Sequence, residues 1–387
     1  MPVHPIEFRY YYPEMKSIFE EESKLNYWLM VEAALAYAQA EVGNIPKKAA
    51  LEIEKKANLR HVKLSRVKEI ESEIDHDLMA AVKALSEVCK ADSGKYVHLG
   101  ATSYDIEDTA FALQMREAIK IISEDLKKLE EILVEQARKH KDTVCIGRTH
   151  GQHAIPTTYG LKFAVWACEV RRHRQRLKEV EGRILVGKMT GAVGTQASFG
   201  AKGIEIQRLV MERLKLKSVT VSTQVVQRDR HAELTILLAL IAATLDKMAK
   251  EIRNLQRTEI AEVFEPFRRR QVGSSTMPQK RNPHKSERIC SLARMIKSLV
   301  IPAIDNISLE HERDLTNSAS ERIIVPESFI LVDYMLKQLS SIMENLVFNS
   351  EMISRNLELT RGLCMSESVM IKLVEKGMGR QEAHELL

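Results

Sequence analysis

The stretch LTILLALIAATL, residues 234–245, constrains the fold more strongly than any other part of the sequence. Its apolar residues cover nearly every face of a helix, so a helix built from it must be surrounded by other helices or by other subunits. The helical pattern runs over residues 229–265, where Pro266 ends it, and a rise of ~1.5 Å per residue gives a length of ~55 Å. We therefore predict a bundle of long helices that oligomerises through this segment. An amphipathic helix on the surface of a monomer is the alternative.

Two further segments, residues 103–140 and 157–184, have the pattern of very long helices, and strand-like alternation is nearly absent from the sequence. The chain has only 10 prolines and 16 glycines among its 387 residues, which agrees with long helices. The predicted fold class is all-α. An elongated central long-helix bundle over residues 101–345 is flanked by a helical N-terminal domain, residues 1–100, and by a partial C-terminal helical domain, residues 346–387.

Positive charge is concentrated in residues 268–288. The whole chain has a net charge of +5, whereas this segment alone sets seven basic residues against one acid, Glu287. The basic residues are Arg268, Arg269, Arg270, Lys280, Arg281, Lys285 and Arg288. An anionic ligand is the natural partner for such a segment.

The five cysteines lie far apart and form no Cys-x-x-Cys motif, which is typical of reduced residues in a cytosolic protein. The N-terminal sequence MPVHPIEFRYYYPEM lacks the apolar core of a secretory signal. The longest apolar run, residues 236–243, is far shorter than the roughly 18 residues of a membrane span. We predict a soluble, cytoplasmic protein with no membrane partner.

The segment GSSTMPQKRNPHK, residues 273–285, has the composition of a loop. Pro278 and Pro283 each remove a backbone donor and push the preceding residue out of the helical region. The segment could be a flexible connector or a basic localisation patch. Alternatively it is a lid, in which the serines approach the reacting atom while Lys280 and Asn282 stabilise a developing negative charge.

The segment GRTHGQHAIPTT carries His150 and His153. Gly151 and Pro156 favour a loop or the start of a helix there. Each histidine could be a structural residue, a metal ligand or a general acid. The sequence offers no carboxylate or cysteine cluster to complete a tetrahedral metal site, which disfavours the metal.

Three other polar segments are candidates for a site. In IDHDLMA, His76 stands between Asp75 and Asp77, which would orient it and favour its charged form, although a surface salt-bridge cluster fits equally well. In VHLGATSYDIEDTAF, the residues His98, Thr102 and Ser103 precede or begin a long helix.

The spacing Thr102-x-x-Asp105 is typical of helix capping, and the same helix start could bind a carboxylate or phosphate. In HERDLTNSASER, residues 311–322, Ser318 and Arg322 share a helical face. That face is either solvated charge or a phosphate clamp. The segment VGKMTGAVG does not match the phosphate-loop pattern and is rejected as one.

Taken together and in this order, the motifs resemble the fumarase/aspartase superfamily, whose signature G-S-S-x-M-P-x-K-x-N-P is matched by GSSTMPQKRNP. Within it the chain looks like the adenylosuccinate lyase branch. The resemblance covers essentially the whole chain and is carried by RYYYPEM, IDHD, VHLGATSYDIEDT, GRTHGQHAIPTT, STQVVQRDRHAE and HERDLTNSASER.

The resemblance implies β-elimination of fumarate from adenylosuccinate, giving AMP, and from succinylaminoimidazole carboxamide ribotide in purine biosynthesis. It implies that Ser274, or alternatively Ser275, is the base and that His150 is the acid, held by Glu287. Lys280 and Asn282 would bind the succinyl carboxylate. The residues implied to contact phosphate and ribose are Arg9, Tyr10, Arg288, Arg313, Ser318 and Arg322. Those implied to line the rest of the site are Asp75, His76, Asp77, His98, Thr102, Ser103 and Gln224.

The resemblance further implies a homotetramer with active sites shared among subunits, with no metal or organic cofactor and no nucleic-acid partner. Gln279 departs from the histidine that many adenylosuccinate lyases have there and is common in argininosuccinate lyases. The chain also stops before a further helical stretch that is usual in the family. Another lyase of the superfamily, acting on argininosuccinate or a carboxymuconate, is the nearest alternative. A non-catalytic helical scaffold that binds RNA is a more distant one.

Overall fold

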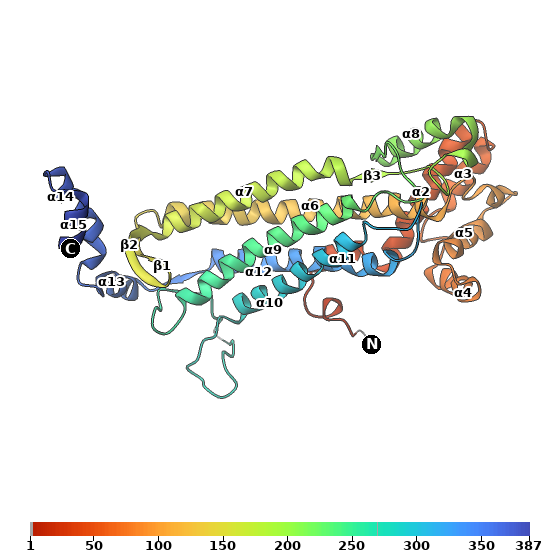
Figure 1. Cartoon of the computed structure of the whole chain (residues 1–387). Helices are drawn as coiled ribbons and strands as arrows, with labels where there is room; N and C mark the ends of the chain where they lie inside the picture. Colours follow the sequence, from red (N-terminus) through yellow and green to blue (C-terminus); the bar gives the residue numbers. More distant parts are fainter. Residues whose placement is uncertain (1–2, 269) are drawn as a thin grey trace. The chain divides into compact units, whose positions relative to one another are not determined.

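The computed structural model describes residues 3–268 and 270–387, so Arg269 of the predicted basic segment lies outside the described residues. The chain divides into two compact units. Unit 1 comprises Met1–Glu124, Gln175–Leu240 and Ile296–Tyr334, and unit 2 comprises Asp125–Arg174, Ile241–Met295 and Met335–Leu387. Helices account for most of the described residues in both units, which confirms the all-α class (Figure 1). The domain boundaries at residues 100 and 345 stay a prediction.

Unit 1 contains the shorter helices that precede the first long helix, together with two more short helices from later in the chain. Their bounds are α1 Pro13–Ile18, α2 Glu21–Glu41, α3 Lys47–Lys56, α4 Leu64–Ile74, α5 Asp77–Val88, α8 Gly203–Leu214 and α11 Val300–Asp305. Short 3-10 turns are η1 Pro5–Glu7, η2 Ser93–Tyr96 and η3 Ala197–Lys202. Helix α2 packs against α3, α5 and α8, and α4 packs against α5.

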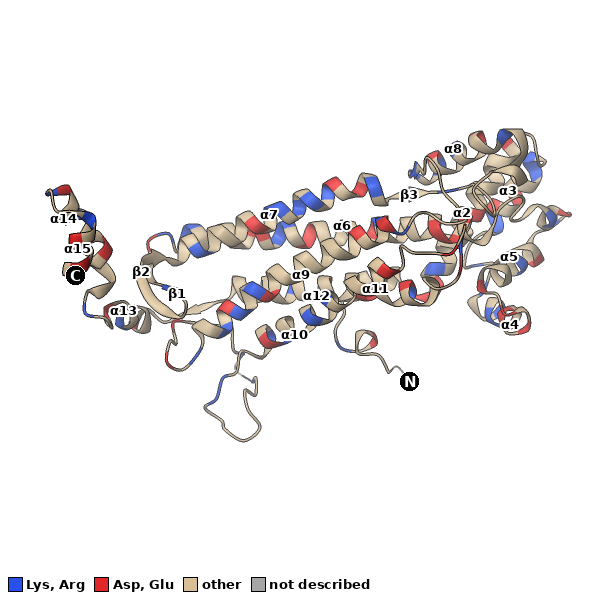
Figure 2. Ribbon diagram, viewed as in Figure 1, with Lys and Arg blue, Asp and Glu red and all other residues tan. Residues whose placement is uncertain are grey.

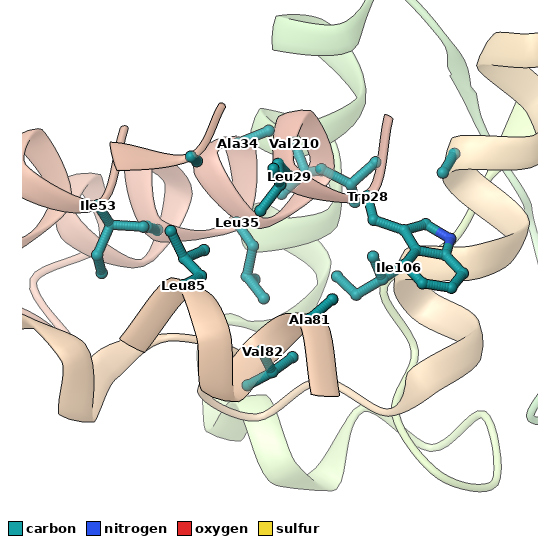
Figure 3. Packing of buried hydrophobic residues seen from close by; sticks show 14 of the residues in the cluster. Trp28, Leu29, Ala34, Leu35, Ile53, Ala81, Val82, Leu85, Ile106 and Val210 are labelled. Atoms are coloured by element: carbon teal, nitrogen blue, oxygen red, sulfur yellow. The ribbon is translucent and has the colours of Figure 1, made fainter. Parts of the chain in front are cut away.

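The core of these short helices is aliphatic and closely packed. Leu29, Leu35 and Leu85 are each no more than 1% exposed, and Ile53 and Val210 are fully buried. Figure 3 shows their side chains pointing into the space between the helices. Burying a leucine or isoleucine side chain stabilises a fold by roughly 1.5–3 kcal/mol, so this cluster fixes α5 and the start of α6, which carry Asp77 and Ser103.

Four long helices contribute residues to both units: α6 Ser103–Lys139, α7 Tyr159–Ile184, α9 Asp229–Leu255 and α12 Ser318–Glu344. A fifth, α10 His284–Ser298, ends three residues into unit 1. The predictions for residues 103–140 and 157–184 are therefore confirmed to within two residues at each end.

The prediction that the third helix reaches Pro266 is wrong, because α9 ends at Leu255. The chain then turns, and β5 Val263–Phe264 pairs antiparallel with β6 Val347–Phe348. Glu262, the residue before β5, is fully buried and accepts hydrogen bonds from Arg148, Tyr159 and Asn356. These tertiary bonds, together with the strand pairing, outweigh the local preference for helix.

The apolar middle of α9 is mostly buried, as the prediction requires. No charged residue lies between Glu233 and Asp246, and Figure 2 shows this middle part without charge. Leu238, Ile241 and Ala242 are fully buried. Two side chains on one face remain open, Ile236 at 37% and Leu240 at 47% exposure.

Unit 2 contains a β-hairpin that the sequence analysis did not predict, formed by β1 Val144–Thr149 and β2 Gln152–Thr158. Its turn is His150–Gly151, and both residues have positive φ, 53° and 77°. A two-residue turn with two positive φ values is the type that matches the twist of a hairpin, and glycine and histidine tolerate that conformation better than most residues. The prediction of a loop or helix start around Gly151 and Pro156 is thus corrected to strand, turn and strand.

The remaining elements are short. In unit 1, β3 Val186–Gly187 pairs parallel with β4 Lys217–Ser218. In unit 2 the chain ends in α13 Ser350–Glu358, η4 Leu363–Met365, α14 Ser366–Glu375 and α15 Arg380–Leu386. Helix α13 contacts β1, and η4 contacts β2.

Candidate active site

Unit 1 has a hollow of about 680 Å³ at the start of α6. Eight of the polar residues predicted to bind the substrate line it, although they come from segments far apart in the sequence. These residues are Asp75, His76, Asp77, Ser103, Gln224, Arg313, Ser318 and Arg322. The grouping is a structural fact, whereas the role of each residue remains a proposal.

His76 is oriented by the backbone rather than by the two flanking carboxylates. It is the N-cap of α5, where its Nδ1 accepts a hydrogen bond from the Met79 amide at 3.3 Å. Its Nε2 is 3.3 Å from the Ser103 hydroxyl. Asp75 instead ends α4 in the left-handed conformation, with φ of 53°. The imidazole of His76 and the Ser103 hydroxyl therefore lie side by side in the lining of the hollow.

The start of α6 is held by a buried ion pair. Asp105 accepts a hydrogen bond from the Thr102 amide at 2.9 Å, which is the capping contact expected from their spacing. The same carboxylate contacts Lys188 Nζ at 2.5 Å, and neither side chain is exposed. It also accepts bonds from the amides of Thr190 and Gly191. Lys188 belongs to the segment that was rejected as a phosphate loop. Its buried ion pair with Asp105 instead anchors the start of α6, the helix that carries Ser103.

His98 is bound to a carboxylate that the sequence analysis did not single out. Its Nδ1 lies 2.6 Å from Glu32 Oε1, and its amide donates to Glu32 Oε2 at 3.1 Å. Burial alone would lower the pKa of His98, but the Glu32 carboxylate outweighs burial and raises it. The side chain is 11% exposed and has φ of 63°, so this histidine is firmly placed beside the start of α6.

Arg313 and Tyr104 form one wall of the hollow. The guanidinium of Arg313 lies 3.7 Å from the centroid of the Tyr104 ring, and it donates to Gln224 Oε1 at 2.7 Å. Gln224 in turn donates to the Ala192 carbonyl at 2.8 Å. Tyr104 donates to the Ser318 hydroxyl at 3.4 Å. The Nε of Arg313 is buried and no protein atom accepts its hydrogen bond, so the guanidinium has one unused N–H donor in this wall.

Arg322 lies in a cluster of opposite charges. It donates to Asp77 at 2.9 Å and approaches Glu107 at 4.0 Å. Lys24 approaches the same Asp77 oxygen at 3.4 Å and lies 4.4 Å from the Trp28 ring. Burial works to raise the pKa of Asp77, but the two cations outweigh it and lower that pKa. Asp77 therefore orients Arg322 rather than His76.

The predicted residues Arg9 and Tyr10 lie in unit 1 just after η1. The guanidinium of Arg9 is 5.7 Å from the Tyr10 ring centroid, and Tyr10 packs edge-on against Tyr334 with centroids 5.7 Å apart. The side chain of Arg9 is exposed. These two residues are outside the set that lines the hollow.

In unit 2 the signature segment forms a loop with a narrow neck between α9 and α10 (Figure 1). Asn282 donates to the Gly273 carbonyl at 2.8 Å. A Cβ on Gly273 would lie 2.0 Å from the Lys280 carbonyl oxygen, so only glycine allows the two strands of the neck to approach this closely. The glycine is therefore required by close approach and not by an unusual φ.

The neck is connected to the end of α9 by Gln256. This side chain donates to the Arg281 carbonyl at 2.9 Å and accepts from the Glu265 amide at 3.0 Å. The Glu265 carboxylate, 3% exposed, accepts from the amides of Lys285 and Ser286. A carboxylate at a helix N-terminus is favourable, so Glu265 fixes the start of α10.

A second hollow, of about 830 Å³, lies between this loop and the end of α9 in unit 2. The predicted residues Lys280, Asn282 and Glu287 line it, together with Gln279. Basic side chains at the end of α9 and just after it line the same hollow, namely Lys250, Arg253 and Arg257. The hollow thus favours an anion. Arg288 lies in the first turns of α10 and is half-buried.

His150 is exposed at the tip of the hairpin, and His153 lies on β2 opposite Arg148. Gly151 and His153 line a third hollow of unit 2, of about 620 Å³. Burial, assisted by Arg148, lowers the pKa of His153. The two histidines thus differ: one is presented to solvent by a tight turn, and the other is held neutral beside an arginine.

Four residues of the unit 1 hollow and its surroundings were missed by the sequence analysis: Lys24, Glu32, Tyr104 and Glu107. Tyr104 and Glu107 belong to the VHLGATSYDIEDTAF segment, where the helical spacing from Ser103 could have placed Glu107 on the same face. Lys24 and Glu32 lie in α2, and nothing in their local sequence distinguishes them from other charged residues.

Within residues 3–268 and 270–387, no helix is long and apolar enough to cross a membrane. Among the same residues, no group of three or more histidine, cysteine or acidic side chains is placed to hold a metal ion.

Comparison with known proteins decides the family. The family described as Lyase matches residues 7–297. An adenylosuccinate lyase of Pyrococcus abyssi is 62% identical over 387 residues, which is 100% of this chain and 86% of the relative. One from Pyrococcus horikoshii is 61% identical with the same coverage. The chain belongs to the adenylosuccinate lyase family. Membership of this family confirms the resemblance inferred from the motifs and the prediction of a lyase.

Solved structures of the wider superfamily share the fold. A 3-carboxy-cis,cis-muconate lactonizing enzyme from Pseudomonas putida is 36% identical with a TM-score of 0.89, and the match covers 99% of this chain and 85% of that chain. Its lower sequence identity, compared with the adenylosuccinate lyases, sets the family apart from this neighbour.

Proposed function

We propose that the protein catalyses the β-elimination of fumarate from adenylosuccinate, giving AMP, and from succinylaminoimidazole carboxamide ribotide in purine biosynthesis. The observation that carries the proposal is the 62% identity, over the full chain, to a relative named adenylosuccinate lyase. The hollow of unit 1 supports it, because Arg313, Ser318 and Arg322 offer donors suited to a phosphate.

The chemical difficulty of this reaction is the removal of a proton from carbon. A C–H next to a carboxylate is weakly acidic, and the intermediate carries additional negative charge on that carboxylate. One well-placed donor stabilises such a charge by ~3–4 kcal/mol. Lys280 and Asn282 are proposed to supply these donors from the loop. Asn282 keeps one N–H for the substrate while it donates the other to Gly273.

Ser274 is the proposed base, and its surroundings favour it over Ser275. Serine is a poor base unless its alkoxide is stabilised. The Oγ of Ser274 accepts hydrogen bonds from the amides of Thr276 at 3.3 Å and Met277 at 3.1 Å. Hydrogen bonds to an oxygen favour its negatively charged form, so this turn supports the alkoxide of Ser274.

His150 is the proposed acid that protonates the leaving nitrogen, with Glu287 as the residue that holds it. The exposed hairpin tip supports this role, because an acid must reach a substrate held by other elements. Once the base has taken the proton from carbon, the C–N bond breaks, its electron pair stays on nitrogen, and the acid delivers a proton there.

The remaining residues are proposed to bind the substrate, as the family resemblance implies. For phosphate and ribose they are Arg9, Tyr10, Arg288, Arg313, Ser318 and Arg322. For the rest of the substrate they are Asp75, His76, Asp77, His98, Thr102, Ser103 and Gln224. The observation that supports this assignment is that eight of these residues line the unit 1 hollow.

We further propose a cytoplasmic homotetramer whose active sites combine residues of neighbouring subunits. The exposed apolar residues Ile236 and Leu240 on α9 support a subunit interface. The free cysteines, of which Cys168 is exposed, support a reducing compartment.

Two substrates test the proposed function. Fumarate release from adenylosuccinate, followed by absorbance, is the expected result with the purified protein. Release of fumarate from argininosuccinate, with none from adenylosuccinate, would assign the chain to another activity of the superfamily.

A further inference from the structure

Glu107 is a buried carboxylate beside the proposed phosphate-binding residues. It lies one turn after Ser103 on α6, lines the unit 1 hollow, and has a side chain that is 14% exposed. It also lines a smaller hollow of about 260 Å³ behind the same wall. An ionised carboxylate in this position repels a bound phosphate, and the sequence analysis gave Glu107 no role.

The charged groups facing Glu107 come from three other helices. They are Lys24 of α2, Asp77 of α5 and Arg322 of α12. Arg322 is 2.9 Å from Asp77 and 4.0 Å from Glu107, and Lys24 is 3.4 Å from Asp77. With both acids ionised, the cluster of two cations and two anions is neutral.

On the helix of Glu107 itself, the negative charge of Asp108 adds to the rise of the Glu107 pKa. Asp108 is held by the guanidinium of Arg228 through two hydrogen bonds of 2.9 Å. Arg228 also donates to Glu321 at 2.8 Å. Tyr104 donates to Ser318, and burial raises its pKa, so it stays neutral.

Glu107 can change its charge in the neutral range. Burial raises its pKa to about 7, and the nearby negative charge of Asp77 adds to the rise, against the opposing effects of Lys24 and Arg322. Protonation would leave the cluster with one net positive charge next to the phosphate-binding wall. A neutral Glu107 no longer offsets the charge of Arg322 from 4.0 Å away, so the N–H groups of Arg322 that do not bind Asp77 can meet a phosphate in a positively charged surrounding.

We propose that Glu107 is a positioning residue that takes up a proton from solvent when the nucleotide phosphate occupies the unit 1 hollow, which leaves a net positive charge beside Arg322 to attract that phosphate. This inference rests on the proposed function, because it takes the phosphate of AMP or adenylosuccinate as the ligand. The carboxylate gains one proton, and its like-charge repulsion of the phosphate dianion is removed. The hydrogen bond that Arg322 donates to Asp77 continues to orient the guanidinium.

Proton uptake can be measured directly with AMP as the probe. Calorimetric titrations at pH 8, in two buffers of different ionisation enthalpy, report the number of protons bound with the ligand. The phosphate has a second pKa of about 6, so at pH 8 it binds as the dianion and contributes little to this number. We expect the wild-type protein to take up a substantial fraction of one proton per AMP.

A Glu107→Gln variant tests the assignment, because glutamine keeps the shape and cannot ionise. For the wild type, the Kd for AMP should rise between pH 7 and 8.5, by at most about tenfold per pH unit for one proton. For the variant the Kd should change little over this range, and at pH 8 it should be several-fold lower than that of the wild type. Glu117→Gln, on the exposed face of α6 where Glu117 pairs with Lys120, is the matched control and should behave as wild type.

Each other outcome is decisive. A variant that binds AMP more weakly at every pH would show a merely structural role. Proton uptake that persists in the variant would belong to another group such as His76, and wild-type binding without uptake would also overturn the inference while leaving the proposed function intact. A wild-type protein that neither binds AMP nor cleaves adenylosuccinate would refute the proposed function itself.

Discussion

The ammonium of Lys188 lies 2.5 Å from the carboxylate of Asp105, and both side chains are fully buried. Removing one partner of such a pair leaves an uncompensated charge and typically costs ~3–5 kcal/mol. We therefore expect Lys188→Met to lower the free energy of unfolding by about this amount and to reduce activity, because α6 would lose the anchor near Ser103. Chemical denaturation followed by circular dichroism measures the change.

The exposed pair Lys120–Glu117 on the same helix provides the control. Lys120→Met should change stability by less than about 1 kcal/mol, as for other surface ion pairs. A double variant, Lys188→Met with Asp105→Asn, should recover part of the loss. Equal effects of Lys188→Met and Lys120→Met would mean that the buried pair does not hold the helix start.

The second prediction concerns the proposed acid and base. His150→Asn and Ser274→Ala should each reduce turnover by several orders of magnitude while the assembly stays intact. Asparagine is chosen at position 150 because it tolerates the observed φ of 53°, so the change removes the imidazole and spares the turn. Steady-state kinetics and size-exclusion chromatography are the measurements.

Two neighbouring variants complete that comparison. Ser275→Ala should retain far more activity than Ser274→Ala, and His153→Asn more than His150→Asn. If the ranking of either pair were reversed, the corresponding role would move to Ser275 or to His153.

The third prediction concerns the neck of the loop. Gly273→Ala would place a Cβ 2.0 Å from the Lys280 carbonyl, so the neck must open and Lys280 must move. We expect a loss of activity of at least a hundredfold with little change in thermal unfolding, since the loop lies outside the helical core. Gly182→Ala is the control, because the added Cβ meets only the flexible end of Lys217 at 3.4 Å. Full activity in Gly273→Ala would show that the neck geometry is dispensable.

The fourth prediction is a pH dependence of stability that arises from Glu321. Burial works to raise the pKa of this group, but His231 and Arg228 outweigh it and lower the pKa to about 2. A depressed pKa gives stability that is present above the unfolded value of about 4.5 and is lost as the pH falls toward 2.

The Glu321→Gln variant lacks this titration. The stability difference between wild type and variant should narrow by on the order of 2 kcal/mol between pH 5 and pH 3, since one pKa unit corresponds to about 1.4 kcal/mol. Thermal unfolding at both pH values measures it. A difference that stays constant would assign the acid sensitivity to other carboxylates.

The fifth prediction concerns assembly. Ile236→Asp combined with Leu240→Asp should shift the protein toward smaller species in analytical ultracentrifugation and reduce activity in parallel, because charge is placed on the open apolar face of α9. Lys217→Asp, on the exposed strand β4, should leave the assembly unchanged. A dissociated double variant with full activity would separate catalysis from assembly.

The long helices could be predicted because their signal is local and repeated. Leu126, Leu129 and Leu133 of α6 are all fully buried, as their spacing indicates. The end of α9 could not, because Glu262 leaves the helix for partners at positions 148, 159 and 356. A sequence window around residue 262 contains none of them.

The residues of the candidate site likewise divide into those with a local sequence signal and those that depend on tertiary contacts. Short polar motifs identified His76, Ser103, Arg313 and Arg322, and the structure brings all of them to one hollow. The hairpin around His150 was missed because β1 and β2 are short and lack a clear alternation. Glu107 was missed because its importance depends on burial and on cations from other helices, and neither is visible in its own segment.

The double hydrogen bond made by Gln256 has an evolutionary consequence. By joining the backbone at Glu265 and Arg281, it sets where α10 begins regardless of what the intervening chain does. Doubling the length of a flexible loop adds only about 0.6 kcal/mol of closure entropy. Insertions should therefore be tolerated among natural homologues in residues 266–272, which precede the signature, whereas the proposed catalytic residues Ser274 and Lys280 and the residues at the mouth should vary little. A library of insertions in residues 266–272, with the signature kept, would measure how far this loop can be lengthened before turnover falls.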